Sequence, residues 1–508
     1  RKVNFIPNKL IFLRKTKINE LFYIDSLIKS NETLLSHIKD KSIILSIHQI
    51  GKNEFERLYL TKLSGKFEAN QVFKALTNNV LLKYENSHFR YNQVRIHKVK
   101  SKLNVFFYCF HRGVLMGSSS ELLIKDAIRQ VENPNGLLLN ADLNQLLKTA
   151  GENVDANVYF QLNEAKNLLS EVLSEQSLKS NNLNHVGNWL ELDLNLKNNT
   201  LLLNGFNANI SANDFQILFE GQQATNLKYP KFAPVGVNSV FAFGLTDYDK
   251  YKENFRKFME NNQQIERYLV NQKAFKQAFG ENAEAQLAEI FKNELAQIEL
   301  SDGSFLFYVR TKGYRDGHEL IQSWINTYAK NVGENSSAYK KIYKLDSESE
   351  FPIYTLPLNH VPTRLFGPWF KACEANYVTI FDDYLIFSSS YKALTRTIYN
   401  NILQKTLSYN AAYNSYANYL SSKVNMHAFI SLESMHTTLE NFLTPAAFSF
   451  CEKHQETLKD FYGLTWQFSN ESGLVYNNLL VRNQPAKTMK AATEWEARLD
   501  TLVAFQPQ

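Results

Sequence analysis

Two stretches of this sequence share one pattern: Tyr108–Ile128, YCFHRGVLMGSSSELLIKDAI, and Val378–Ile398, VTIFDDYLIFSSSYKALTRTI. In each, a run of alternating apolar residues contains a polar turn and ends in three serines, and a helix-like apolar period follows. Ser118 falls on Ser388, an offset of 388 − 118 = 270 residues. The pattern therefore predicts, twice, a β-hairpin followed by a helix whose first turn is capped by a serine hydroxyl.

The same offset continues beyond the serines. It places four further residues on identical partners: Leu137 on Leu407, Asn140 on Asn410, Leu162 on Leu432 and Leu173 on Leu443. A weaker match, at offset 262, pairs 40–47 with 302–309. We therefore predict an internally duplicated chain, with repeat one at 1–228, repeat two at 229–485 and a helical tail at 486–508.

The fold class follows from the elements inside each repeat. Alternation in 104–116 and in 377–387 indicates half-buried antiparallel strands, with turns at Arg112-Gly113 and at Asp382-Asp383. A strand and a helix are expected in Pro7–Ile28, and amphipathic helices throughout Asp247–Leu300, interrupted near Gly280. Antiparallel sheets covered by helices make an α+β protein.

Composition excludes several classes. The 508 residues contain 19 Gly and 11 Pro, too few for a collagen-like or Pro/Gly-rich disordered chain, and no apolar run approaches the roughly 20 residues of a membrane-spanning helix. The net charge of +6 is spread thinly, which argues against a nucleic-acid-binding surface. Cys109, Cys373 and Cys451 are an odd set without metal-ligand spacing, so we expect neither a disulfide nor a metal ion.

Three groups of residues were weighed as functional sites. The serine triplets lack the glycines of a nucleophile elbow, which favours capping. Tyr409, Tyr413 and Tyr416 lie on one helix face, but the offset places Leu139, Leu143 and Leu146 there in repeat one, which favours a packing face. His318-Glu319 and Asp382-Asp383 could form a functional site that is present in repeat two only, although each pair is also typical of an ordinary turn or helix start. We therefore assign no catalytic, cofactor-binding or metal-ligating residue.

The segments YLIFSSSYKALTRTI (384–398), MHAFISLESM (426–435) and INELFYIDSLIKSNETLLSHIKDKSIILSIH (18–48) resemble a family of uncharacterised exported envelope proteins of Bacteroidota type, which share a domain of unknown function. The resemblance spans most of the chain but carries no active-site motif. It implies export, commonly with a signal or lipoprotein leader, and in some members a β-propeller-like continuation.

Two kinds of function are consistent with these observations. The first is a non-enzymatic envelope protein, periplasm-facing or lipid-anchored, that binds other envelope proteins as a scaffold or subunit of a membrane-associated complex, such as an outer-membrane secretion or assembly complex. It would use no cofactor and bind no nucleic acid. The alternative is a hydrolase with a single-copy site in the cleft between the repeats. The repeats share apolar spacing, caps and turns rather than titratable residues, which favours the first.

Overall fold

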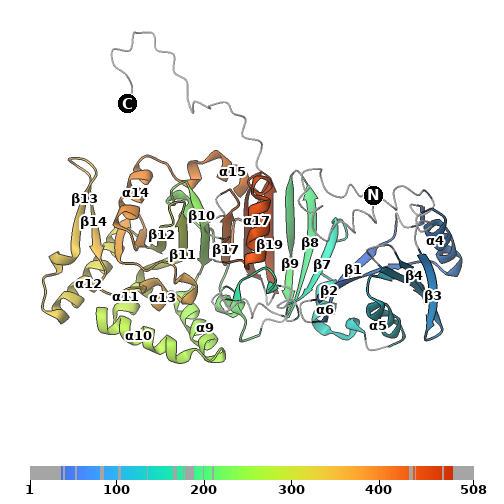
Figure 1. Ribbon diagram of the computed structural model, residues 1–508. Coiled ribbons are helices and arrows are strands. Elements are labelled where there is room, and N and C mark those ends of the chain that lie inside the picture. The colour runs from blue at the N-terminus through green and yellow to red at the C-terminus, as the bar shows by residue number, and fades with distance from the viewer. Residues whose placement is uncertain are drawn as a thin grey trace, which may run out of the picture.

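The computed structural model describes residues 40–483 together with Glu32, Ser36 and His37, apart from 52–53, 80–84, 101–104, 134–135, 163, 165–168, 176, 178–187, 198, 209–210, 434–438, 441 and 472–473. The expected strand and helix of Pro7–Ile28 and the expected tail at 486–508 lie outside the described residues. The described part is an α+β protein with antiparallel sheets and helices on their faces (Figure 1), as the sequence predicted.

The first sheet has six strands and belongs wholly to the first segment of the chain. Its order is β1(Ile43–Gly51), β2(Glu54–Lys62), β6(Val114–Ser118), β5(Val105–His111), β4(Val94–Lys100) and β3(Glu85–Tyr91). Helix α5 (Glu121–Glu132) packs on one face beside Cys109 and Met116, and α4 (Lys66–Asn79) packs on the other beside Phe110 and Leu115. Neighbouring strand residues therefore serve opposite cores, as the two-residue strand period requires.

The second sheet has thirteen strands. In sheet order these are β13(Lys340–Lys344), β14(Glu350–Thr355), β15(Tyr377–Phe381), β16(Tyr384–Ser388), β12(Phe305–Thr311), β11(Phe291–Leu300), β10(Val237–Gly244), β17(Met426–Ser431), β18(Phe461–Glu471), β19(Leu474–Asn483), β9(Thr200–Ala208), β8(Trp189–Lys197) and β7(Ala156–Gln161). The sheet crosses the boundary that we predicted at 228/229, because β9 pairs with β19. The strands of the first segment are thus divided between two sheets.

Helices cover the thirteen-stranded sheet on both faces. One face carries α9(Tyr248–Asn261), α10(Ile265–Phe279), α11(Ala283–Ile290), α12(Tyr314–Val332) and α13(Val361–Phe366), and the other carries α14(Tyr391–Ile402) and α15(Ala411–Ala417). Phe307 and Val309 of β12 enter the first core, while Leu306 and Tyr308 enter the second. Further helices in the described ranges are α6(Ala141–Leu147), α17(Pro445–Lys453) and α18(Gln455–Leu458), with short 3-10 turns η2(Leu137–Leu139), η3(Phe215–Phe219), η4(Tyr229–Lys231), η5(Ser336–Tyr339), η6(Pro368–Phe370) and η7(Leu407–Tyr409).

The two segments place their strands in the same order. The run β2-β6-β5-β4-β3 in the first sheet has the arrangement of β12-β16-β15-β14-β13 in the second. Ser118 pairs with Leu58 of β2, and Ser388 pairs with Leu306 of β12. By strand position β2, and not β1, is therefore the counterpart of β12, so the match at offset 262 paired the wrong strands.

Local expectations held in most places. Helix α10 ends at Phe279, and Gly280 follows with a φ of 98°, a backbone conformation that glycine adopts at little cost. Residues 291–300 are the exception, because we expected a helix and the structure has strand β11. The sequence FKNELAQIEL consists mostly of good helix formers, and pairing with β10 and β12 overrides that propensity.

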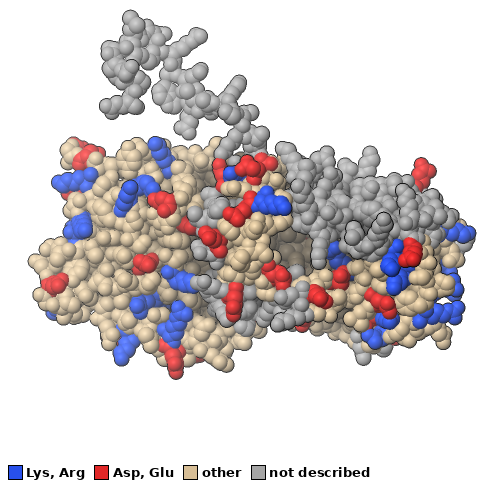
Figure 2. All heavy atoms as spheres, viewed as in Figure 1, with Lys and Arg blue, Asp and Glu red and all other residues tan. Residues whose placement is uncertain are grey.

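Two surface properties bear on function. Figure 2 shows Lys and Arg interspersed with Asp and Glu over the visible face, without a patch of a single sign. Among the described helices, none has the length and apolar character that crossing a membrane requires.

Candidate functional site

The serine triplets have the same structural role in both segments. Ser118 Oγ donates to the carbonyl of Arg57 at 2.6 Å, and Ser388 Oγ donates to that of Phe305 at 2.7 Å. Two residues on, Ser120 and Ser390 are the N-caps of α5 and α14. The caps at Ser120 and Ser390 confirm the capping interpretation, while the buried hydroxyls of Ser118 and Ser388 hold the strand ends to neighbouring backbone carbonyls.

The tyrosine face is partly a packing face, as predicted. Tyr416 is buried and its hydroxyl lies 2.8 Å from Thr465 Oγ1, while Tyr413 is half-buried against the same core. Tyr409 was wrongly included, because it is 63% exposed. The leucines at the matched positions behave alike: Leu143 and Leu146 are buried and Leu139 is exposed.

The two possible single-copy sites have structural partners. His318 Nε2 lies 3.1 Å from Tyr354 Oη, whereas Glu319 points to a surface ion pair with Arg315. Burial, and then the charge of Lys340, lowers the pKa of His318. Asp383 accepts from Arg310 Nε at 2.8 Å and holds the β15–β16 hairpin against β12. Arg310 in turn lies over the ring of Tyr384, whose hydroxyl donates to Glu294, so Asp383 belongs to a chain of polar contacts that ends at a buried carboxylate.

Glu294 is a buried carboxylate that the sequence analysis missed. It accepts hydrogen bonds from the backbone N–H of Lys228 at 2.6 Å, from that of Tyr229 at 2.7 Å and from Tyr384 Oη at 3.0 Å. Burial raises the pKa of Glu294 to about 7, and these bonds oppose the shift. The carboxylate therefore fastens the connection between the two segments to strand β11. An acidic residue in the apolar strand period was the available signal, but that stretch was interpreted as a helix.

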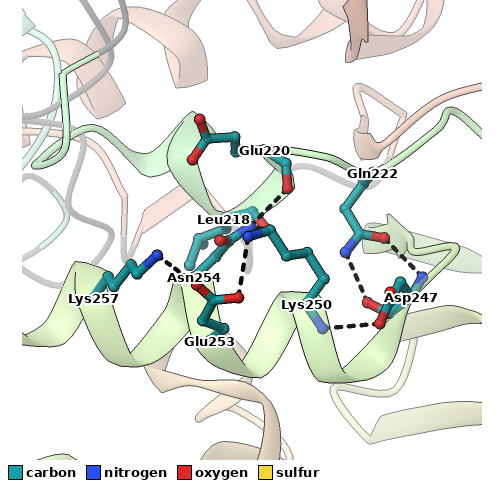
Figure 3. A network of polar contacts seen from close by, with 8 residues as sticks. All are labelled: Leu218, Glu220, Gln222, Asp247, Lys250, Glu253, Asn254 and Lys257. Carbon is teal, nitrogen blue, oxygen red and sulfur yellow. Dashed lines mark hydrogen bonds and ion pairs between the residues drawn. The ribbon is translucent and has the colours of Figure 1, made fainter.

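A second polar network holds the same connection to helix α9 (Figure 3). Gln222 Nε2 donates to the carbonyl of Asp247 at 2.7 Å, and Asn254 Nδ2 donates to that of Glu220 at 2.8 Å. Asp247 also caps α9 by accepting from the N–H of Lys250. Like Glu294, these side chains satisfy backbone groups of a connecting segment, which is a structural role.

An acidic pair, Glu191 and Asp193, lies on one face of β8. Asp193 accepts from the N–H of Gly151 at 2.9 Å and from Asn157 Nδ2 at 2.6 Å, whereas Glu191 is fully buried beside it. Burial, and then the charge of Asp193, raises the pKa of Glu191 to about 8. Burial beside Asp193 therefore favours the protonated, neutral form of Glu191.

The corresponding positions of the second segment hold a neutral network. Gln467 accepts from the N–H of Ser421 at 2.9 Å, as Asp193 accepts from Gly151, and 421 − 151 = 270. Its Nε2 lies 3.1 Å from His427 Nδ1. The scaffold is thus alike in both segments while its titratable groups differ.

The C-terminal turn of α14 exposes three large apolar residues. Tyr399, Ile402 and Leu403 are 46%, 49% and 43% exposed, and their spacing of three and four puts them on one face. Helix α5, 270 residues earlier and equally long, exposes Arg129, Glu132 and Asn133 at the matched positions. Since α5 packs in the same way with polar residues there, folding does not require the apolar ones.

No family model, no curated protein and no solved structure matches this chain. The resemblance to exported envelope proteins therefore stays a prediction.

The apolar face of α14 is the feature that best fits a functional surface. Tyrosine is favoured at the centres of protein interfaces, where a few buried side chains provide most of the affinity. The sequence contained the signal, because the offset of 270 sets Tyr399 against Arg129 and Ile402 against Glu132. The sequence alone could not distinguish this exposed face from a buried one, because it does not give the exposed fractions of the side chains.

Proposed function

We propose that the protein is a non-enzymatic, protein-binding scaffold, and that the apolar face of α14 formed by Tyr399, Ile402 and Leu403 is a partner-binding surface. The observation that carries the proposal is the contrast with α5. Two helices of equal length and similar burial pattern differ at these three exposed positions, where α5 has polar and α14 large apolar residues, whereas near the helix start α5 exposes Leu122 and α14 has Lys392. Exposed apolar side chains that folding does not need favour an interaction site.

The proposed partners are other proteins of the cell envelope, in a membrane-associated complex and without a cofactor. The envelope location, periplasmic or outer-membrane-associated, follows the resemblance of the sequence and is part of the proposal. The mixed charges of the visible surface give no support to nucleic-acid binding. Burying three such side chains contributes roughly 1.5–3 kcal/mol each at most, which suits an interface of moderate affinity.

The test exchanges residues between the two helices. The triple variant Tyr399→Arg, Ile402→Glu, Leu403→Asn gives α14 the exposed residues of α5, and Arg129→Ala with Glu132→Ala is the matched control on α5. The full chain is purified from its native envelope fraction, and bound proteins are identified with a photo-crosslinker at 399 or at 129. We expect crosslinks from 399 only, and at least about tenfold less partner on the triple variant.

Thermal unfolding of the triple variant should stay close to that of the unchanged chain, because the three positions are exposed. Equal partner retention by the triple variant, or equal crosslinking from both helices, would contradict the proposal.

The alternative hydrolase has one observation in its favour, the pair Glu191 and Asp193. Two neighbouring carboxyl groups, of which burial favours the protonated form of one, resemble an acid and base pair. Glu191 is fully buried, however, so a substrate would reach it only after the strands or the 149–155 loop opened. Substrate turnover that is lost in Glu191→Gln and in Asp193→Asn, with the fold intact, would establish this alternative.

A further inference from the structure

Strand β3 is the outer strand at one end of the first sheet (Figure 1). Within the described ranges it pairs with β4 alone. In an antiparallel pair every second residue turns its backbone N–H and C=O away from its partner, so one edge of β3 is open. An open edge can pair with a further strand. The side chains on the two faces of β3 decide which strand fits.

One face of β3 and β4 carries two cross-strand pairs of basic residues. Arg90 is the register partner of Arg95. His88 is that of His97, whose ring stacks on Tyr108 with 4.9 Å between the ring centres. Burial, and then the charges of Arg95 and His88, lower the pKa of His97. Like charges directly opposite each other destabilise a strand pair, so this face favours a bound negative charge.

The two arginines are exposed and without a counter-charge. In the part of the chain that the structure describes, neither guanidinium has an ion pair or an aromatic ring beside it. The cations on the opposite face of β4 do have partners. Lys100 Nζ lies 3.8 Å from Glu85 Oε2, and Lys98 Nζ lies 5.6 Å from the ring centre of Phe107.

The corresponding edge of the second segment has partners for its cations. By strand position it is β13, which is also an outer strand. Lys344 Nζ lies 2.6 Å from Glu350 Oε1, and Lys341 Nζ lies 5.7 Å from the ring centre of Tyr391. Since β13 forms the same edge with paired cations, folding does not require the unpaired arginines of β3 and β4.

The other face of β3 is aromatic. Phe89 and Tyr91 alternate with His88 and Arg90 along the strand and are half-buried. Lys125 Nζ lies 5.8 Å and 5.6 Å from the centres of the two aromatic rings. A strand added to β3 therefore meets basic side chains on one face and aromatic ones on the other.

We propose that the open edge of β3 binds an extended segment of a partner protein in which acidic residues alternate with apolar ones. The acidic side chains lie beside His88 and Arg90 and neutralise the basic pairs, while the apolar ones lie beside Phe89 and Tyr91. In strand addition the backbone hydrogen bonds give affinity and the alternate side chains give specificity. This surface is separate from the apolar face of α14 and goes beyond the proposed function.

Charge favours a partner protein over two other occupants. Two copies of β3 joined edge to edge would set their basic faces side by side, and like charges in such positions repel. Residues 1–17 of this chain contain six Lys or Arg and no Asp or Glu, so they do not complement the basic face either.

Peptide binding to the full chain tests the proposal. The probe is the labelled peptide Thr-Val-Glu-Val-Glu-Val-Thr. The control, Thr-Val-Val-Glu-Glu-Val-Thr, has the same composition but puts one Glu on each face of the strand. In fluorescence anisotropy we expect the probe to bind at least about fivefold more tightly than the control, and more weakly as salt is added.

Charge reversal locates the binding site. Arg90→Glu should weaken binding of the probe at least about fivefold and should instead bind a peptide that has Lys in place of both Glu residues. Recovery with the Lys peptide also shows that the variant is folded. Lys341→Glu makes the same change on the edge strand β13 and is the matched control, which should bind the probe like the unchanged chain.

Several results would overturn the proposal. Equal affinity for the probe and the control peptide, or undiminished affinity of Arg90→Glu for the probe, would do so. Outward N–H groups of β3 that are protected from hydrogen exchange in the dilute chain would show that another segment of this chain occupies the edge. Protection that grows with protein concentration would assign the edge to a second copy. The triple variant of α14 should bind the probe unchanged, so this proposal and the proposed function fail independently.

Discussion

Leu173 and Leu443 form an antiparallel bridge with each other, although they are 443 − 173 = 270 residues apart. Around them the N–H of Ser174 donates to the carbonyl of Phe442, and the N–H of Thr444 donates to that of Val172, both at 2.9 Å. Residues related by the offset thus meet each other, as they would around a local two-fold axis. These contacts support the duplication, which we retain as a proposal.

The bridge predicts a crosslink. In antiparallel pairs the Cα atoms lie about 4.5–5.5 Å apart, within the range that a disulfide spans. In a Cys451→Ser background, Leu173→Cys with Leu443→Cys should therefore form a disulfide under mild oxidation, seen as a shift in non-reducing electrophoresis. Either single variant is the control, and a folded double variant that stays reduced would contradict the bridge.

Glu294 should make stability depend on pH. Its pKa is about 7 in the folded chain against 4.5 ordinarily, so the folded state binds the proton more tightly. The free energy of unfolding should therefore fall as pH rises from about 4.5 to 7, by at most about 3 kcal/mol from this group. Glu294→Gln should lack this component when unfolding in urea is compared at pH 5 and pH 7.5.

Glu294→Ala should have a lower free energy of unfolding than Glu294→Gln at every pH. It leaves the N–H groups of Lys228 and Tyr229 and the hydroxyl of Tyr384 without their acceptor, at a cost of about 1–3 kcal/mol for each buried group. Equal stability of the two variants would show that the carboxylate does not fasten the connection.

His427 should also make stability depend on pH, but at lower pH and with the opposite sign to Glu294, so that stability falls as pH falls. Burial lowers the pKa of His427 to about 4, while the unfolded chain binds the proton near 6.5. Stability from this group is complete above pH 6.5 and is lost as pH falls towards 4, by at most about 3 kcal/mol. His427→Asn, which introduces the residue found at Asn157, should remove this acid sensitivity. An unchanged pH profile from 7 to 4 would contradict burial of a neutral imidazole.

The caps of α5 and α14 should contribute equally to the stability of the folded chain. Ser120→Ala and Ser390→Ala each remove the acceptor for one backbone N–H, that of Leu123 or of Ala393, and should cost about 1 kcal/mol. Urea unfolding of the two variants checks this, with Ser347→Ala, at an exposed position, as control. A cost confined to one of the two would show that their roles differ.

Local chemistry determined what the sequence predicted correctly. Hydroxyl caps at Ser120 and Ser390, the hairpin turns at Arg112-Gly113 and Asp382-Asp383, and the helix end at Gly280 depend on residues within a few positions. The α+β class follows, because alternating and helical periods are both local patterns.

Tertiary structure alone decided how those elements combine. Residues 291–300 became strand β11 because β10 and β12 pair with them on both sides, and the burial of Glu294 followed from that pairing. The pairing of β9 with β19 joined the two segments in one sheet, and the strand order made β2 the counterpart of β12. Strand pairing and burial can depend on residues that are far apart in the sequence. A local sequence pattern therefore does not determine which neighbouring strand a given strand will pair with.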